Sequence, residues 1–181
     1  MLTAQPIPQR WIEMADLLSH VLAAYAIFTV ASWRLEWLTK RWVAVAMIGA
    51  LLPDLNRIGL FVTDATLEAV LGVPFSVDGI HTLGGALVLA GVGSMVLTSQ
   101  HRRAFGTLLG GALSHLLIDG VKAYADGAAG AWLYPFTWYR PPTPSLYISS
   151  DPATLVVTAV AAGLVLLCDR FGVVNGRSFL T

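Results

Sequence analysis

Long apolar stretches separated by short polar turns dominate this chain and predict a bundle of membrane-spanning helices. A helix needs about 20 residues to cross the hydrocarbon core of a bilayer, which is roughly 30 Å thick. Five stretches approach that length, at about residues 17–38, 42–62, 81–99, 104–124 and 153–168. Pro53 lies inside the second stretch, so we expect that helix to kink or end there. The pattern predicts an all-α, polytopic membrane bundle of about five spanning helices, forming a single domain over residues 1–181.

The segments between these stretches predict loops and close helix contacts. Residues 63–80 are typical of a loop with a short amphipathic piece, and residues 126–151 are rich in Pro, Trp and Tyr, which favours an interfacial loop. We expect the tryptophans to anchor the chain at the bilayer surface. Gly106, Gly110 and Ser114 recur at helical spacing, so the fourth stretch is predicted to pack tightly along that face.

Composition supports a membrane environment. Of 181 residues, 56% are hydrophobic and 12% are charged, and the mean hydropathy is +0.68. A soluble domain carries about a quarter of its residues as charged side chains. The formal net charge of zero gives no reason to expect a nucleic-acid partner. The single cysteine, Cys168, cannot form an internal disulfide.

The basic residues predict an orientation in the inner (plasma) membrane. If five helices alternate in direction, seven of the eleven basic residues fall on the side of the Lys40 turn: Arg34, Lys40, Arg41, Arg102, Arg103, Arg170 and Arg177. Cytoplasmic loops carry an excess of Lys and Arg. We therefore expect the N-terminus outside and the C-terminus in the cytoplasm.

Polar residues inside the apolar stretches converge on the outer side under this topology. His115 and Asp119 are four residues apart and share one helix face. Asp54 and His115 each lie about 17 to 18 Å from the inner surface at 1.5 Å per residue. His20 and His81 lie near the outer ends of their helices. Because ionisable groups in spanning helices usually face a cavity or a partner, we predict that these five residues line an outward-facing polar cavity.

Several other polar residues have a simpler interpretation. His101 stands beside two arginines in the predicted inner turn, so we exclude it from the site. We interpret Asp16, Asp64, Glu68 and Asp126 as interface or loop residues. Arg57, Lys122 and Arg140 fall on the outer side, where they could bind a phosphate or another anion, or extend to lipid headgroups.

Five short elements resemble the YdjM-like (LexA-regulated) family of membrane-bound metal-dependent hydrolases. They occur in the family's order: His20, Leu52-Pro53-Asp54-Leu55-Asn56, Ile80-His81-Thr82, His115-xxx-Asp119 and Trp132-Leu133-Tyr134-Pro135-Phe136. Asn56 stands where the family's pattern has a second aspartate. Val77-Asp78-Gly79 replaces the family's His-Arg-Gly lead-in.

The resemblance implies a divalent metal that activates water for hydrolysis. His20, His81 and His115 would supply imidazole ligands, and Asp54 or Asp119 a carboxylate, a set that suits zinc first and manganese or iron next. Whichever aspartate is not a ligand would be the general base. Asn56 could hold a water or a substrate oxygen but cannot accept a proton. The depth of the predicted site and the basic residues near it favour a phosphoester or other ester of a lipid or amphiphile as the substrate.

Two other classes of protein fit the same residues. A non-enzymatic metal-binding protein, a transporter or a proton relay would also use buried His and Asp side chains. A structural membrane protein could use them only to join helices. The nearly apolar inner halves of the helices favour a one-sided site over a path across the membrane.

Overall fold

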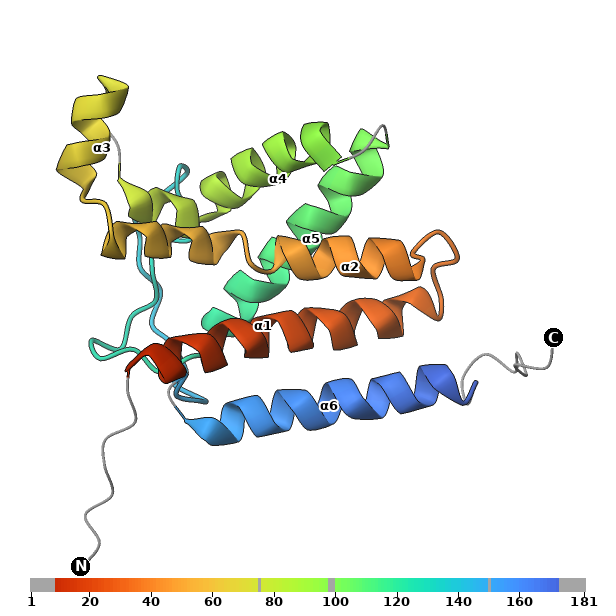
Figure 1. The fold of residues 1–181 in the computed structure, drawn as a ribbon. Helices are drawn as coiled ribbons and strands as arrows, with labels where there is room; N and C mark the ends of the chain where they lie inside the picture. Colours follow the sequence, from red (N-terminus) through yellow and green to blue (C-terminus); the bar gives the residue numbers. More distant parts are fainter. Residues whose placement is uncertain (1–8, 75, 98–99, 150, 173–181) are drawn as a thin grey trace, which may run out of the picture.

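The computed structural model describes residues 9–74, 76–97, 100–149 and 151–172, which form an all-helical bundle, as predicted (Figure 1). The helices in chain order are α1 (Gln9–Ser32), α2 (Lys40–Gly49), η1 (Pro53–Leu60), α3 (Asp64–Leu71), η2 (Val77–His81), α4 (Leu83–Leu97), α5 (His101–Asp119) and α6 (Pro152–Arg170), where η1 and η2 are 3-10 helices. The short amphipathic helix expected within residues 63–80 is α3.

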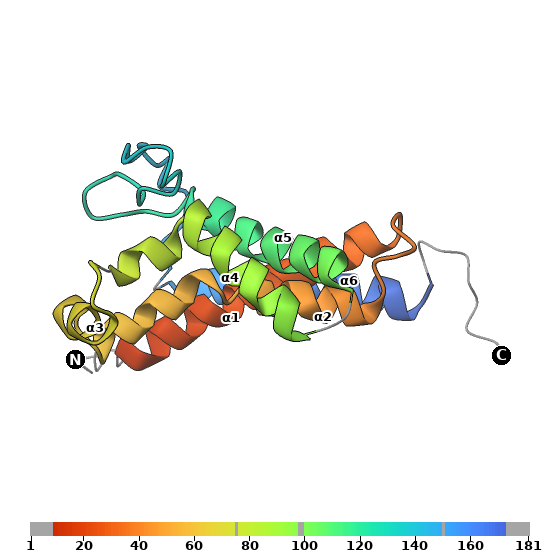
Figure 2. The same ribbon diagram turned by 90° about the horizontal axis from the view of Figure 1, so that it is seen from above.

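The long helices pack side by side in a fixed order. α1 packs against both α2 and α6, and α5 packs against both α2 and α4 (Figure 1). α3 and the loop that follows α5 lie at the same end of the bundle (Figure 2). At the opposite end, Lys40 Nζ lies 3.6 Å from Asp169 Oδ2 and joins the start of α2 to the end of α6.

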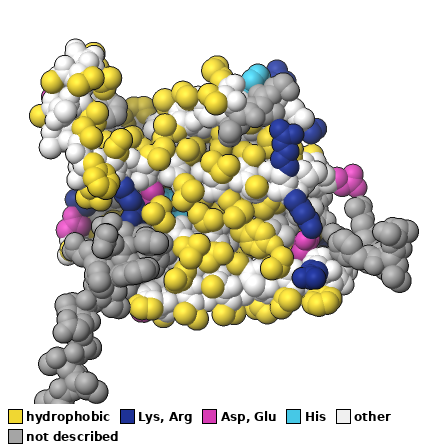
Figure 3. All heavy atoms as spheres, viewed as in Figure 1, with side chains coloured by type: hydrophobic (Ala, Val, Ile, Leu, Met, Phe, Trp, Pro, Cys, Tyr) yellow, Lys and Arg dark blue, Asp and Glu magenta, His cyan; other side chains and the backbone are white. Residues whose placement is uncertain are grey.

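The prediction of five complete spans is not confirmed. Among the described helices, α6 alone is long and apolar enough to cross a membrane by itself. α2 and η1 meet the same criterion only as a pair, bent by 41°. The apolar parts of α1 and α4, Asp16–Ser32 and Leu83–Val96, are shorter than a full span. Hydrophobic side chains nevertheless cover the middle of the face in Figure 3, and charged side chains gather towards its two ends.

Helix boundaries differ from the predicted stretches for local physical reasons. α1 ends at Ser32 rather than near residue 38. α2 ends at Gly49 and η1 begins at Pro53, because proline has no N–H with which to continue the helix. α5 begins at His101, so Arg102 and Arg103 lie in its first turn rather than in a loop, and it ends at Asp119 rather than near residue 124.

One tryptophan lies in the core and a second, partly buried, packs against it, which corrects the expectation that all of them anchor the bilayer surface. Trp42 is buried with Leu38, Val43 and Ala104 where α1, α2 and α5 meet. Trp132 packs against a second buried cluster formed by Ala86, Ala112 and Leu116. The second contact attaches the loop after α5 to α4 and α5.

Glycines bring the backbones of α2 and α5 together, at positions other than those predicted. A Cβ atom on Gly111 would overlap the Ala46 carbonyl oxygen, and one on Gly49 would overlap the Leu108 carbonyl oxygen. Of the residues predicted to share a packing face, Gly106 faces open space, whereas Gly110 is closely packed against the Phe28 ring of α1. The close face of α5 is therefore the one that carries Gly111 and, one turn later, His115.

Gly111→Ala is expected to destabilise the protein, because the added methyl group must push α5 away from α2. Overpacking of this kind costs about 1–3 kcal/mol. Thermal unfolding of the purified protein in detergent, followed by circular dichroism, should show a lower midpoint. Gly106→Ala is the matched control on the same helix, and it should leave the midpoint unchanged or raise it, because Ala favours a helix over Gly. Equal midpoints for the two variants would contradict the close contact.

Candidate metal centre

Three imidazole rings meet at the carboxylate of Asp119. His81 Nε2 lies 3.0 Å from Asp119 Oδ2, and His115 Nε2 lies 3.4 Å from the same oxygen. His20 Nε2 lies 3.3 Å from Asp119 Oδ1. The side chains of His20, His115 and Asp119 are almost completely buried, and His81 is partly exposed. One carboxylate thus stands at the centre of a mainly buried group of nitrogen atoms.

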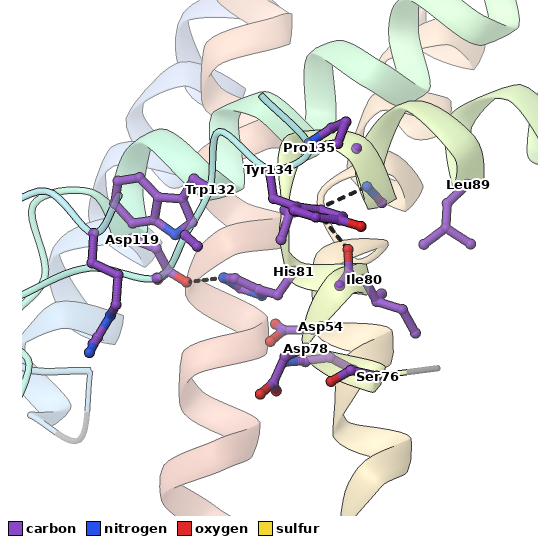
Figure 4. A pocket seen from close by; sticks show the side chains of 18 of the residues that line it. Asp54, Ser76, Asp78, Ile80, His81, Leu89, Asp119, Trp132, Tyr134 and Pro135 are labelled. Carbon is purple, nitrogen blue, oxygen red and sulfur yellow. Dashed lines mark hydrogen bonds and ion pairs between the residues drawn. The ribbon is translucent and has the colours of Figure 1, made fainter. Parts of the chain in front are cut away.

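Three separate elements of the chain position this group. His20 lies on α1, His81 ends η2, and His115 and Asp119 are one turn apart on α5. The His20 and His115 rings stack with their centroids 3.7 Å apart, which holds α1 against α5 at this level. Figure 4 shows His81 directed towards Asp119, with Asp54 nearby. The arrangement brings together all five residues for which the sequence predicts a shared site.

Backbone carbonyls fix the orientation of two of the rings. His115 Nδ1 lies 2.8 Å from the Ala50 carbonyl oxygen, and His81 Nδ1 lies 3.3 Å from the Pro53 carbonyl oxygen. A carbonyl oxygen can only accept a hydrogen bond, so each Nδ1 carries the proton. In a neutral ring of this kind, Nε2 carries a lone pair, and in both rings this lone pair is directed at Asp119. Metal-binding histidines commonly donate their other N–H to a carbonyl in this way.

This arrangement fits a divalent metal. Lone pairs of Nε2 and carboxylate oxygens repel one another unless a cation lies between them. Within the described chain, the buried polar atoms without a hydrogen-bond partner include His20 Nδ1, Asp54 Oδ2, His115 Nε2 and Asp119 Oδ1. Two ligands of one tetrahedral zinc ion lie about 3.3 Å apart at the usual distances, close to the 3.0–3.4 Å between each of these nitrogens and an Asp119 oxygen.

Two overlapping groups have ligand atoms close enough to hold an ion. One consists of His20, His115 and Asp119, and the other of Asp54, His81 and His115. His115 belongs to both, but its Nδ1 is engaged by Ala50, which leaves Nε2 as its ligand atom. Since Nε2 faces Asp119, the geometry favours Asp119 over Asp54 as the carboxylate ligand. Nitrogen and oxygen donors in this combination suit zinc, manganese or iron.

Asp54 lies beside the candidate ligands, in a different environment. Its Oδ1 accepts a hydrogen bond of 3.0 Å from Arg57 Nε. Its Oδ2 lies 3.9 Å from His115 Nδ1. Arg57 thus holds Oδ1 of Asp54, whereas Oδ2 has no hydrogen-bond partner in the described structure. Oδ2 is therefore available to a water or substrate group that lies between Asp54 and the candidate ligands.

Asp16 belongs to this site, which corrects its interpretation as an interface residue. The side chain is buried, and Oδ1 lies 3.6 Å from His20 Nε2. Its Oδ2 lies 3.1 Å from Arg57 Nη2 and 3.4 Å from Lys122 Nζ. The sequence contained a signal, because Asp16 and His20 have the same four-residue spacing as His115 and Asp119. Asp64, interpreted in the same way, instead accepts a hydrogen bond from the Val77 N–H.

A cavity of about 1230 Å³ opens in front of these residues. Its wall includes Asp54, His81 and Asp119, whereas the nearly inaccessible His20 and His115 lie outside that wall. The other polar side chains that the sequence assigned to the outer side also line it: Asn56, Arg57, Lys122 and Arg140. A bound ion would therefore be approached from the His81 and Asp119 side.

The three candidate anion-binding cations already have acidic partners. Arg57 bridges Asp54 and Asp16, and Lys122 Nζ lies 3.5 Å from Asp119 Oδ1 as well as near Asp16. Arg140 Nη1 lies 2.7 Å from Asp126 Oδ2. This hydrogen bond holds the pKa of the exposed Asp126 below its usual value. Arg140 also donates to backbone carbonyls of the same loop, so its main contacts stabilise the loop.

Two tyrosines of the loop complete the surroundings of Asp119, and sequence patterns gave no signal for them. Burial raises the pKa of Tyr124 and of Tyr147, and the negative charge of Asp119 raises both further. Both phenols therefore stay protonated near neutral pH. Tyr124 lines the cavity, and Lys122 Nζ lies 5.7 Å from the centre of its ring.

His101, which the sequence excludes, lies away from this centre. It begins α5, and its Nδ1 donates a 2.9 Å hydrogen bond to the Ser94 carbonyl. It is exposed, unlike the three histidines at Asp119.

The helical bundle, its apolar surface and the buried His/Asp group define a membrane protein with a candidate metal-binding centre. Residues 14–180 match the family model described as YdjM inner membrane protein. The chain belongs to this family, which confirms the resemblance seen in the sequence motifs and indicates a membrane location. No significant match was found among curated proteins or among solved structures.

Removal of one candidate ligand should remove the metal. We expect the purified protein to carry a divalent ion and His115→Ala to lose it, because the variant lacks the buried Nε2 that faces Asp119. Elemental analysis of the two proteins, prepared in parallel, measures this. His101→Ala is the control, since it removes a histidine at the other end of α5. Equal metal content in the wild type and His115→Ala would argue against the centre.

Asp16→Asn should weaken metal binding without removing a ligand. The change leaves Arg57 and Lys122 without their shared carboxylate, so Lys122 would pair more strongly with Asp119 and compete with the ion. Loss of a residue that supports the ligands typically lowers metal affinity about 10–100-fold. Competition with a chelator of known affinity measures the change. Asp169→Asn, which removes a carboxylate near Lys40, should keep wild-type affinity; a similar loss in both variants would contradict a specific role for Asp16.

Proposed function

We propose that this protein is a membrane-embedded, metal-dependent hydrolase that cleaves a phosphoester or other ester of an amphiphilic substrate. The observation that carries the proposal is the convergence of three imidazoles on Asp119 beside a second carboxylate, Asp54, at the wall of a large cavity. A site that only stores a metal needs nothing beyond the metal ligands. A hydrolytic site also needs a base near the ligands and space for a substrate, and this site offers Asp54 as the base and the cavity as the space.

In the proposed reaction, His20, His81, His115 and Asp119 hold the divalent ion, with zinc the first candidate and manganese or iron the next. When bound, such an ion lowers the pKa of water towards neutrality and polarises the oxygen of the bond under attack. The sequence left the roles of Asp54 and Asp119 open. The contacts of Asp119 favour its role as ligand, which leaves Asp54 as the general base.

The residues around Asp54 fit this role. Arg57 Nε holds Oδ1, so the carboxylate is fixed in orientation while Oδ2 remains available to accept a proton. The Asn56 amide can hold a water or a substrate oxygen. Arg57 and Lys122 line the cavity paired with Asp16, Asp54 and Asp119, and with a divalent ion bound this group would carry a net positive charge, which favours an anionic group such as a phosphate. The neutral Tyr124 phenol can donate a hydrogen bond to the same group.

We further propose that the site faces the non-cytoplasmic side of the inner membrane. Lys40, Arg41, Arg102 and Arg103 lie at helix ends opposite to those that carry the candidate ligands, and the inner leaflet side is normally enriched in basic residues. A proton relay would need polar groups that continue towards that end. There the buried hydrophobic cluster is Leu38, Trp42, Val43 and Ala104, and the buried Thr107 hydroxyl donates to carbonyls of its own helix, which favours a one-sided site.

Asp54→Asn should abolish most of the hydrolysis while the metal stays bound. The amide keeps the shape of the carboxylate but cannot accept a proton, and loss of a general base typically lowers the rate about 10²–10⁴-fold. Release of product from phospholipids and lipid phosphates, by purified protein with and without a chelator, measures the rate; elemental analysis measures the metal.

Asp169→Asn is again the control and should keep both rate and metal. A wild-type rate in metal-loaded Asp54→Asn would show that Asp54 is not the base. If the metal-loaded wild type gives no chelator-sensitive product from any of these substrates, the proposed function is wrong.

A further inference from the structure

The cavity in front of the candidate metal centre has a second, apolar part. Its polar part carries Asp54, His81 and Asp119. The remainder of the wall includes an apolar group that we call the apolar arm, formed by Ile80, Val88, Leu89, Pro135 and Trp138. In Figure 4, Ile80, Leu89 and Pro135 lie on the other side of His81 from Asp119. A small water-soluble ester would not need this additional apolar wall.

The apolar arm continues onto the exposed surface of α4. Val88, which lines the cavity, is 65% exposed, and Val92, Met95 and Val96 follow it at helical spacing on the same face with 57–79% exposure. These four side chains form one apolar stripe along a helix of a membrane protein. Trp138, which lines the cavity from the loop after α5, is also largely exposed. The arm is therefore continuous with a surface suited to the hydrocarbon interior of the bilayer.

The two walls of the arm are held at a fixed separation. The Leu83 N–H donates to the Trp132 carbonyl at 2.7 Å, and the Gly84 N–H donates to the Tyr134 carbonyl at 2.9 Å. A Cβ atom on Gly84 would lie 3.0 Å from Pro135 Cδ, so the start of α4 and the loop are in close contact. The tilted contact between the Tyr134 and Trp138 rings, 4.4 Å between centroids, stiffens the loop wall. The arm is thus part of the packed fold.

We propose that the apolar arm binds a hydrocarbon chain of an amphiphile, which reaches it from the bilayer along α4, and that the polar head lies at the candidate metal centre. The placement of the head rests on the proposed function. The occupant follows from charge and continuity: Arg57 and Lys122 lie at one part of the cavity, and the other part joins the apolar stripe of α4. The site therefore takes a substrate with an anionic head and a long apolar chain.

Photolabelling tests the chain site without requiring turnover. The probe is dodecyl phosphate with a diazirine at the chain end, added to the full-length protein in phosphatidylcholine vesicles. We expect saturable labelling of residues 80–89 or 132–138, displaced by excess dodecyl phosphate and not by ethyl phosphate. Labelling of α6 serves as the background, because this helix would be labelled only by probe dissolved in the bilayer. Labelling of α4 at that same level, with no competition by dodecyl phosphate, would overturn the chain site.

Two substitutions on α4 make the test specific. Val88→Trp fills the apolar arm and should lower the saturable labelling about tenfold, since it displaces several buried methylene groups. Val92→Trp places the same side chain one turn further along the stripe, outside the cavity wall, and should label like the wild type. Leu89→Trp fills the arm from the next position on α4 and should reproduce the loss. Equal labelling in Val88→Trp, Leu89→Trp and Val92→Trp would contradict the proposal.

Turnover of alkyl phosphates from ethyl to dodecyl separates this inference from the proposed function. If both are right, kcat/KM rises with chain length in the wild type, and Val88→Trp removes that rise. Saturable labelling without any metal-dependent turnover would support the chain site and count against hydrolysis of these phosphates. Turnover that is equal for ethyl and dodecyl phosphate, without saturable labelling, would overturn the chain site and support the hydrolase.

Discussion

The site depends on the break in the chain between α2 and η1. Proline at position 53 cannot donate the hydrogen bond that would continue α2, so the helix ends, the chain bends by 41°, and backbone carbonyls near the break face other parts of the chain. Two of them are used by the site: the Ala50 carbonyl orients His115, and the Pro53 carbonyl orients His81. A broken helix in a membrane protein is tolerated where its backbone groups find such partners. The break therefore supplies the two acceptors that direct both Nε2 atoms towards Asp119.

Close packing of α2 and α5 makes this contact possible. Gly111 lies against Ala46 and Ala50 without a side chain between them, and His115 follows it by one turn on the same face of α5. The helices are therefore near enough for His115 to reach the Ala50 carbonyl. Charge then favours a cation at the same place. If the histidines are neutral, the contact network of Asp16, Asp54, Asp119, Arg57 and Lys122 carries one more negative than positive charge, which a divalent ion would reverse.

Sequence patterns predicted those parts of the structure that depend on one helix at a time. Apolar length predicted the helical bundle, and the four-residue spacing placed His115 beside Asp119. The depth estimate brought Asp54 to the level of His115 although the chain between Trp42 and Asp54 is not one straight helix. Contacts between helices were harder to predict. Gly106 and Gly111 are five residues apart and lie on different faces of α5, and the sequence does not say which face meets α2. Asp16 and His20 are one turn apart on α1, a spacing that the sequence shows, but the ion pairs of Asp16 with Arg57 and Lys122 join distant parts of the chain.

The different environments of Asp54 and Asp119 explain how two similar carboxylates can have different roles. Asp119 lies on a regular helix, is contacted by three imidazoles and Lys122, and is almost completely buried, as suits a ligand. Asp54 follows Pro53 at the break, where Arg57 on the next turn holds one of its oxygens and leaves the other without a hydrogen bond in the described structure. A regular helix thus fixes the carboxylate that would hold the ion, and the broken helix presents the one that would accept a proton.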